Sequence, residues 1–131
     1  MIYIKVNDAL YPAMVSGKEA DRDWDGRRSK SITMNGDYAT VNDLFPDGVA
    51  WSIVCEENAP VMDEEGNYVL NKNGEQTYET RQVEYDNSDF NMRGSITVHA
   101  DGTCTVKMGH KTEVEELREL TDELLLEVLG V

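Results

Sequence analysis

The sequence is short of basic residues. It has 12 lysines and arginines against 26 aspartates and glutamates, which gives a formal net charge of −14. Such an excess of negative charge repels phosphate backbones and anionic lipid surfaces at ordinary salt. We therefore expect no nucleic-acid binding and no membrane binding. The charge serves solubility, or it favours a protein partner that presents a basic surface.

Cysteine and histidine are scarce as well, with two residues of each. Cys55 and Cys104 lie far apart and lack the C-x-x-C spacing of a redox or zinc motif. His99 and His110 have no nucleophile elbow, phosphate loop or dinucleotide fingerprint to accompany them. We expect no cofactor and no catalytic residues, and we predict that the protein is not an enzyme.

Long apolar runs are also missing. No segment approaches the roughly 20 apolar residues of a membrane span. Residues 1–6 alternate like a strand and lack the basic and apolar regions of a signal peptide. We expect the protein to be made and kept in a cytoplasm, with reduced cysteines. Its 131 residues match the size of one domain.

The patterns that are present favour β structure. The longest near-continuous apolar run covers residues 48–56 and follows a Pro-Asp-Gly turn signal. This run predicts a central strand. Alternation would place Val49, Trp51, Ile53 and Cys55 on its buried face.

A second β signal lies near residue 100. A two-residue loop would pair apolar with polar side chains, whereas a three-residue loop at residues 100–102 pairs Val98 with Cys104 and Ile96 with Val106. We therefore predict the three-residue loop, with its Gly102 in the left-handed conformation.

Between these two strand signals, residues 58–84 look least like a core. Two glycine-containing turn signals predict a long, exposed hairpin arm that protrudes from the domain. Exposed aromatic residues are favoured anchors in protein interfaces. Trp24, Tyr68, Tyr78 and Tyr85 are therefore the candidate interaction residues. The alternative is that they close over the edge of the core.

Two helices complete the prediction. A short one spans residues 37–45, and a longer one spans 112–129, opened by a Thr112–Glu115 capping box. The leucine-rich face of the longer helix would cover a sheet or a partner, and a homo-oligomer through it is one expectation. The predicted fold is thus a single α+β domain, residues 1–131, mainly antiparallel β in a sandwich or a partly open barrel.

One half-motif suggests a metal. Asp21, Asp23 and Asp25 match the first half of a calcium loop, in which carboxylates and a turn glycine surround a hard cation. The second half fails, because Arg28 replaces an apolar residue and Ile32 stands where a bidentate glutamate is required. We expect a charged loop and no metal site.

Four segments carry a resemblance: residues 23–30, 49–53, 85–89 and 106–109. Together they resemble small uncharacterised proteins of phages and prophages of Gram-positive bacteria, encoded near tail and lysis genes. The resemblance implies a phage-derived protein that is associated with the tail of the virion or that interacts with the host, and it supplies no catalytic residues. We expect such a protein to be made in the bacterial cytoplasm.

Three functional hypotheses follow from the sequence. The first is a non-enzymatic structural or protein-interaction module of a phage, associated with the tail. The second is an acidic inhibitor, or nucleic-acid mimic, that binds a basic host or phage protein. The third and weakest is a hydrolase whose catalytic carboxylates the sequence does not locate. Some of the 26 acids lie close together by chance, so proximity of two carboxylates is no evidence for such a site.

Overall fold

The computed structural model describes residues 2–130, which form seven strands, two α-helices and one short 3-10 helix. In chain order these are β1 (Ile2–Val6), β2 (Ala9–Asp21), η1 (Arg22–Trp24), β3 (Arg27–Asn35), α1 (Tyr38–Leu44), β4 (Ser52–Pro60), β5 (Tyr78–Asp86), β6 (Met92–Val98), β7 (Thr103–Gly109) and α2 (Glu113–Leu129). The predicted α+β class is confirmed. The strands make one antiparallel sheet, in the order β5-β4-β1-β2-β3-β7-β6, that does not close into a barrel.

The long strand β2 holds the two halves of the sheet together. Its first residues pair with β1 and its later ones, from Ala13 on, pair with β3. The β1–β2 turn uses Asn7 and Asp8 at φ 53° and 63°, a conformation that these two residue types tolerate in a tight hairpin. Because it cannot donate to a ladder, Pro12 predicts that this strand lies at an edge or carries a bulge there. Pro12 lies instead where β2 changes partners.

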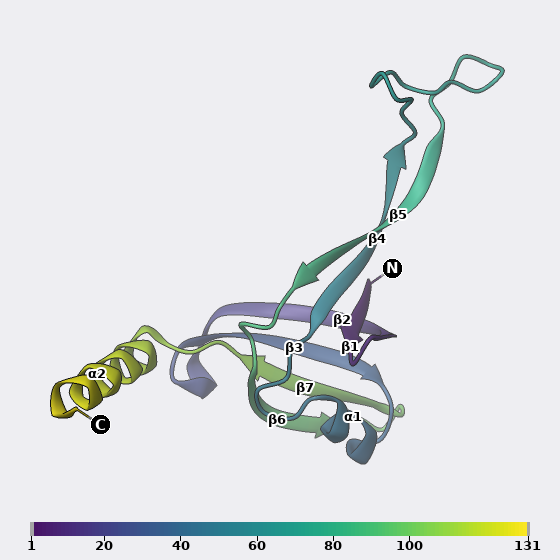
Figure 1. Ribbon diagram of the computed structural model, residues 1–131. Coiled ribbons are helices and arrows are strands. Elements are labelled where there is room, and N and C mark those ends of the chain that lie inside the picture. The colour runs from purple at the N-terminus through teal and green to yellow at the C-terminus, as the bar shows by residue number, and fades with distance from the viewer. Residues whose placement is uncertain (1, 131) are drawn as a thin grey trace.

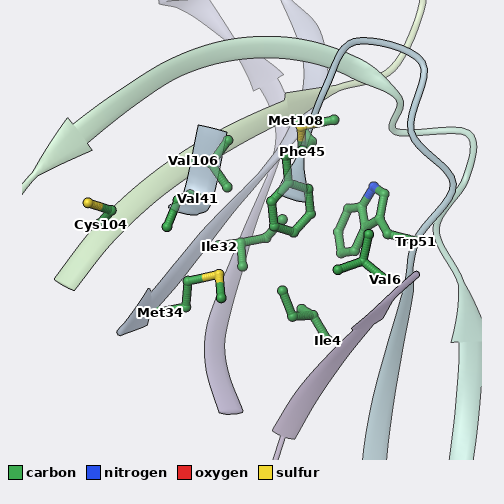
Figure 2. Packing of buried hydrophobic residues seen from close by; sticks show 10 residues of the cluster. All are labelled: Ile4, Val6, Ile32, Met34, Val41, Phe45, Trp51, Cys104, Val106 and Met108. Carbon is green, nitrogen blue, oxygen red and sulfur yellow. The ribbon is translucent and has the colours of Figure 1, made fainter. Parts of the chain in front are cut away.

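The core lies on one face of this sheet, under α1 and the segment that leads to β4 (Figure 2). Asp37 caps α1 by accepting a hydrogen bond from the backbone N–H of Thr40 at 2.8 Å. Val41 and Phe45 then bury their side chains completely. The other fully or almost fully buried members are Ile4, Val6, Ile32, Met34, Trp51, Cys104, Val106 and Met108.

The prediction that residues 48–56 form a central strand is wrong about the position of the strand in the sheet. β4 begins at Ser52 and is second from the edge, between β1 and the edge strand β5. Trp51 is buried as expected, but Cys55 is only partly covered, while Val54 on the opposite face is 4% exposed. The face that carries Val54 also carries the side chains of its two cross-strand partners, Tyr3 on β1 and Glu84 on β5, which flank it.

The β6–β7 hairpin has the predicted register. Val98 pairs with Cys104 and Ile96 with Val106, and Gly102 has a φ of +87°. The inward residues of β7 are buried, whereas Val98 is 60% exposed. It lies on the edge strand β6, close to the loop of the hairpin.

Helix α2 begins and ends as the sequence predicts. Thr112 and Glu115 form the capping box, and Gly130 ends the helix at a φ of +71°. The helix continues without a break through Thr121 and buries none of its residues. Figure 1 shows it pointing away from the sheet. Between residues 2 and 130, no helix has the length and apolar content needed to cross a membrane.

Candidate protein-interaction site

The arm predicted from the sequence is an extension of the β4–β5 hairpin. These strands pair continuously from Ser52–Asp86 at the sheet to Pro60–Tyr78. The outer part of the arm stands clear of the rest of the sheet, as Figure 1 shows. The stalk of the arm is therefore an ordinary two-stranded ribbon rooted in the core.

At the end of this ribbon, three backbone hydrogen bonds form a ring. Val61 donates to the carbonyl of Thr77 at 2.8 Å, Thr77 donates to that of Val69 at 3.0 Å, and Val69 donates to that of Val61 at 2.9 Å. The stalk and two small loops meet at this ring. The loops diverge at the top of the arm in Figure 1.

The two loops are built alike. In the first, the side chain of Asp63 accepts hydrogen bonds from the backbone of Glu65 and Asn67 at 3.0 and 2.9 Å. In the second, Asn71 does the same for the residues two and four positions later, at 2.9 and 3.1 Å. Each loop contains a glycine, with φ of 85° in the first and 80° in the second. Side-chain acceptors of this kind hold a turn in place without a hydrophobic core.

The ring determines which side chains share a face. Residues 61, 69 and 77 form the ring, so alternation places their sequence neighbours on the opposite side of the tip. Four of these neighbours are large and half exposed, with 50% to 62% of their surface accessible. They are Met62, Tyr68, Leu70 and Tyr78. We call these four residues the tip face.

The structure therefore brings together two of the four predicted interaction residues. Tyr68 and Tyr78 belong to the tip face. Tyr85 lies near the base of the arm, opposite Ile53, and its hydroxyl is 3.4 Å from Glu57. The negative charge of Glu57 raises the pKa of Tyr85. Met62 and Leu70 were missed, although each directly precedes the Asp or Asn that begins a turn.

Trp24 is not part of this surface. Its ring lies over β6 and β7, so close that a Cβ on Gly94 or Gly109 would be 2.9 or 2.7 Å from it. The guanidinium of Arg27 lies 5.0 Å from the ring centroid. This is the alternative considered for the aromatic residues: Trp24 closes over the sheet.

The three aspartates of the calcium half-motif do not converge. Asp21 is fully buried and pairs with Lys107 at 2.8 Å, and it accepts a hydrogen bond from Ser29 at 2.9 Å. Asp25 points into solvent, 87% exposed. Within residues 2–130, no group of three or more metal-ligating side chains is close enough to hold an ion.

Asp21 and Glu115 link the stability of the fold to pH. Hydrogen bonding to Lys107 lowers the pKa of Asp21 to about 2. The backbone N–H of Thr112, and next the guanidinium of Arg27, lower the pKa of Glu115 to about 2. The ordinary values are 3.8 and 4.5, so both groups bind fewer protons when folded. Acid therefore favours the unfolded state.

We expect this contribution to be complete above about pH 5 and to be lost progressively as the pH falls towards about 2. The measurement is urea unfolding across this range and up to neutral pH, for the wild type and Glu115→Gln. The variant should lose stability less steeply, because one of the two shifted carboxyls is gone. Comparing the two proteins cancels the relief of negative repulsion that acid brings to both. Parallel pH profiles would contradict the prediction.

An open hollow of about 550 Å³ lies elsewhere, bordered by β1, β2, β3 and the start of β7. Apolar side chains, among them Ile2, Met14, Val15 and Met34, make up much of its lining, and among the described residues no acidic, basic or histidine side chain borders it. Its lining therefore offers no general acid or base.

Comparison with known proteins adds no relative. No protein-family model, no curated protein and no solved structure matches this chain.

Proposed function

We propose that the protein is a non-enzymatic protein-interaction module of a phage particle, associated with its tail, and that it binds its partner through the tip face. The tip face is the observation that supports this proposal most. Single exposed apolar residues are common, but several grouped on one protruding element are typical of an interaction site. The phage context comes from the resemblance of four sequence segments.

The physical chemistry of the tip suits binding. Tyrosine and methionine are enriched in protein interfaces, and central aromatic residues carry much of the binding energy. The hydrogen-bonded ring and the two side-chain acceptors order the tip before a partner arrives, which reduces the entropy lost on binding.

The charge around the tip face indicates the chemistry of the partner. Residues 58–84 contain six acidic and two basic side chains. A partner with an apolar pocket and a basic rim would match both the tip face and its surroundings.

The test uses particles of a phage that encodes this chain. Mass spectrometry of purified particles should detect the protein at a fixed copy number. Tyr68→Ala combined with Tyr78→Ala should lower that number by about tenfold or more, since interface aromatics are common hot spots. Tyr85→Ala is the matched control, because Tyr85 is also 50% exposed but lies outside the tip face. Absence of the wild type from particles, or equal loss in both variants, would refute the proposal.

Removal of the tip should spare the fold. We expect that replacing residues 61–77 with Asn-Gly, a preferred two-residue hairpin loop, changes the free energy of unfolding by only about 1 kcal/mol. The reason is that Pro60 and Tyr78 are already paired at that level of the stalk. Urea unfolding would measure the change. Cooperative loss of structure would show that the tip belongs to the core.

The acidic inhibitor is the second candidate function, and the distribution of charge favours it. Residues 113–129 contain seven acidic side chains and one basic, so this helix and residues 58–84 together hold ten of the fourteen excess negative charges. Retention of a nucleic-acid enzyme that weakens steeply with salt, and is insensitive to the tip-face substitutions, would support the inhibitor against the interaction module.

A further inference from the structure

Helix α2 exposes an apolar surface that nothing in the described chain covers. Its large apolar residues are each 50% or more exposed. They are Val114, Leu117, Leu120, Leu124, Leu125, Leu126, Val128 and Leu129. In water, an amphipathic helix of this length owes most of its stability to the packing of its apolar face. The surface therefore requires an occupant.

The spacing of these residues matches a coiled-coil seam. Residues Val114, Thr121 and Val128 repeat every seven positions, and Leu117 and Leu124 stand three positions after the first two. This is the a and d pattern of a heptad, with β-branched residues at a and leucine at d. In parallel coiled coils, that combination favours a pair of helices.

The polar residue in the seam is already satisfied. The hydroxyl of Thr121 donates to the carbonyl of Leu117 at 2.8 Å within the same helix. Its methyl group can therefore face the seam without burying an unpaired donor.

The body of the protein leaves the seam free. Glu115 binds Arg27 at 2.6 Å and Glu119 binds Lys111 at 2.6 Å, so these two residues face the body. At about 100° per residue, they lie on the side of the helix opposite Leu117 and Leu124. A second helix can approach the seam without displacing either ion pair.

The two charged residues that flank the seam fit a second copy of α2 in the parallel direction. Glu113 and Arg118 occupy the g and e positions that flank the seam, and they are five residues apart. In a parallel pair, Glu113 of one copy meets Arg118 of the other, twice over by symmetry. The antiparallel alignment that pairs Val114 with Leu124 would instead bring Arg118 near Arg118 and Glu113 near Glu127, which are like charges.

We propose that α2 forms a parallel two-stranded coiled coil with α2 of a second copy of this chain. This inference does not depend on the function proposed for the tip face, since the two surfaces lie on different elements. Leu120 and Leu125, at g and e, widen the same seam. A dimer would carry two arms, which raises the apparent affinity for a partner that repeats in space.

Sedimentation equilibrium of the full chain tests the proposal. The wild type should have twice the 14.8 kDa mass of one chain. Leu124→Glu should be monomeric at the same concentrations, because it buries a charge in the seam. Leu126→Glu is the matched control: Leu126 is 50% exposed, against 53% for Leu124, but lies on the opposite side of the helix. It should remain dimeric. A monomeric wild type, a higher oligomer, or equal weakening by both variants would overturn the proposal.

A charge exchange tests the direction of the helices. Glu113→Arg should weaken the dimer several-fold, because it places two positive charges opposite each other across the parallel pair. Adding Arg118→Glu to the same chain should restore the wild-type dissociation constant. In the antiparallel alignment described above, Glu113→Arg would instead tighten the dimer by meeting Glu127. That result would refute the parallel arrangement. Circular dichroism confirms that each variant stays folded.

Discussion

Replacing Trp51 with alanine should lower the free energy of unfolding by about 3–5 kcal/mol, the largest effect that we expect of any single substitution here. Trp51 is 2% exposed. Its ring meets Phe45 edge to face, with centroids 6.0 Å apart, and its indole N–H donates to the carbonyl of Phe90 at 2.8 Å. Figure 2 shows the two rings beside Val6.

The loss has two parts. Alanine leaves a cavity that the surrounding side chains fill only partly, and the carbonyl of Phe90 loses its donor. Trp51→Phe separates these parts, because it keeps an aromatic ring and removes the donor, so it should cost clearly less. Urea unfolding followed by far-ultraviolet circular dichroism measures both. A loss below about 1 kcal/mol for Trp51→Ala, typical of a surface position, would show that the core is not organised around this residue.

Gly109→Ala should lower the free energy of unfolding by about 1–3 kcal/mol, as overpacking does. The added Cβ would be 2.7 Å from the ring of Trp24 and 2.8 Å from the Cδ of Arg27. Gly17→Ala is the control, since it also changes a strand glycine but meets only the carbonyl of Ser29 at 3.8 Å. Its effect should stay within about 1 kcal/mol, in the stabilising direction.

A double substitution tests whether the ring of Trp24 causes the loss of stability in Gly109→Ala. In a Trp24→Ala background, Gly109→Ala should cost less, because the ring is gone and only the close approach to the Cδ of Arg27 remains. Differential scanning calorimetry of the four proteins gives the coupling. Strict additivity would mean that Trp24 does not rest on this part of the sheet. It would also restore Trp24 as a candidate interaction residue.

Local signals allowed much of the fold to be predicted. Caps identify both helices, and side-chain chemistry alone selects the loop that ends in Gly102. The order of the strands could not be predicted in this way, because it depends on pairings such as β1 with β4 that are distant in sequence. The prediction from Pro12 failed for the same reason. An interior strand tolerates this proline because β2 changes its pairing partner there, which the sequence does not reveal.

The candidate site was predicted in part. Turn signals located the arm, and Tyr68 and Tyr78 stood out as exposed aromatic residues. The ring of hydrogen bonds joins residues that are eight or sixteen positions apart, so the two-residue alternation of a strand does not reveal that Met62 and Leu70 share their face. Trp24 was misjudged because Gly94 and Gly109, which make room for its ring, are far from it in the sequence.

The ring at the end of the arm has a consequence for how the protein can change. The first loop leaves the ring at Val61 and returns at Val69, and the second leaves at Val69 and returns at Thr77. The two ends of each loop are joined by a backbone hydrogen bond, so an insertion or a new sequence in one loop shifts neither the stalk nor the other loop. Val61, Val69 and Thr77 therefore form a fixed support from which the two loops can vary separately. Selection, or an engineer, could exchange the recognition loops one at a time on a constant support, as antibodies vary their loops on a constant sandwich.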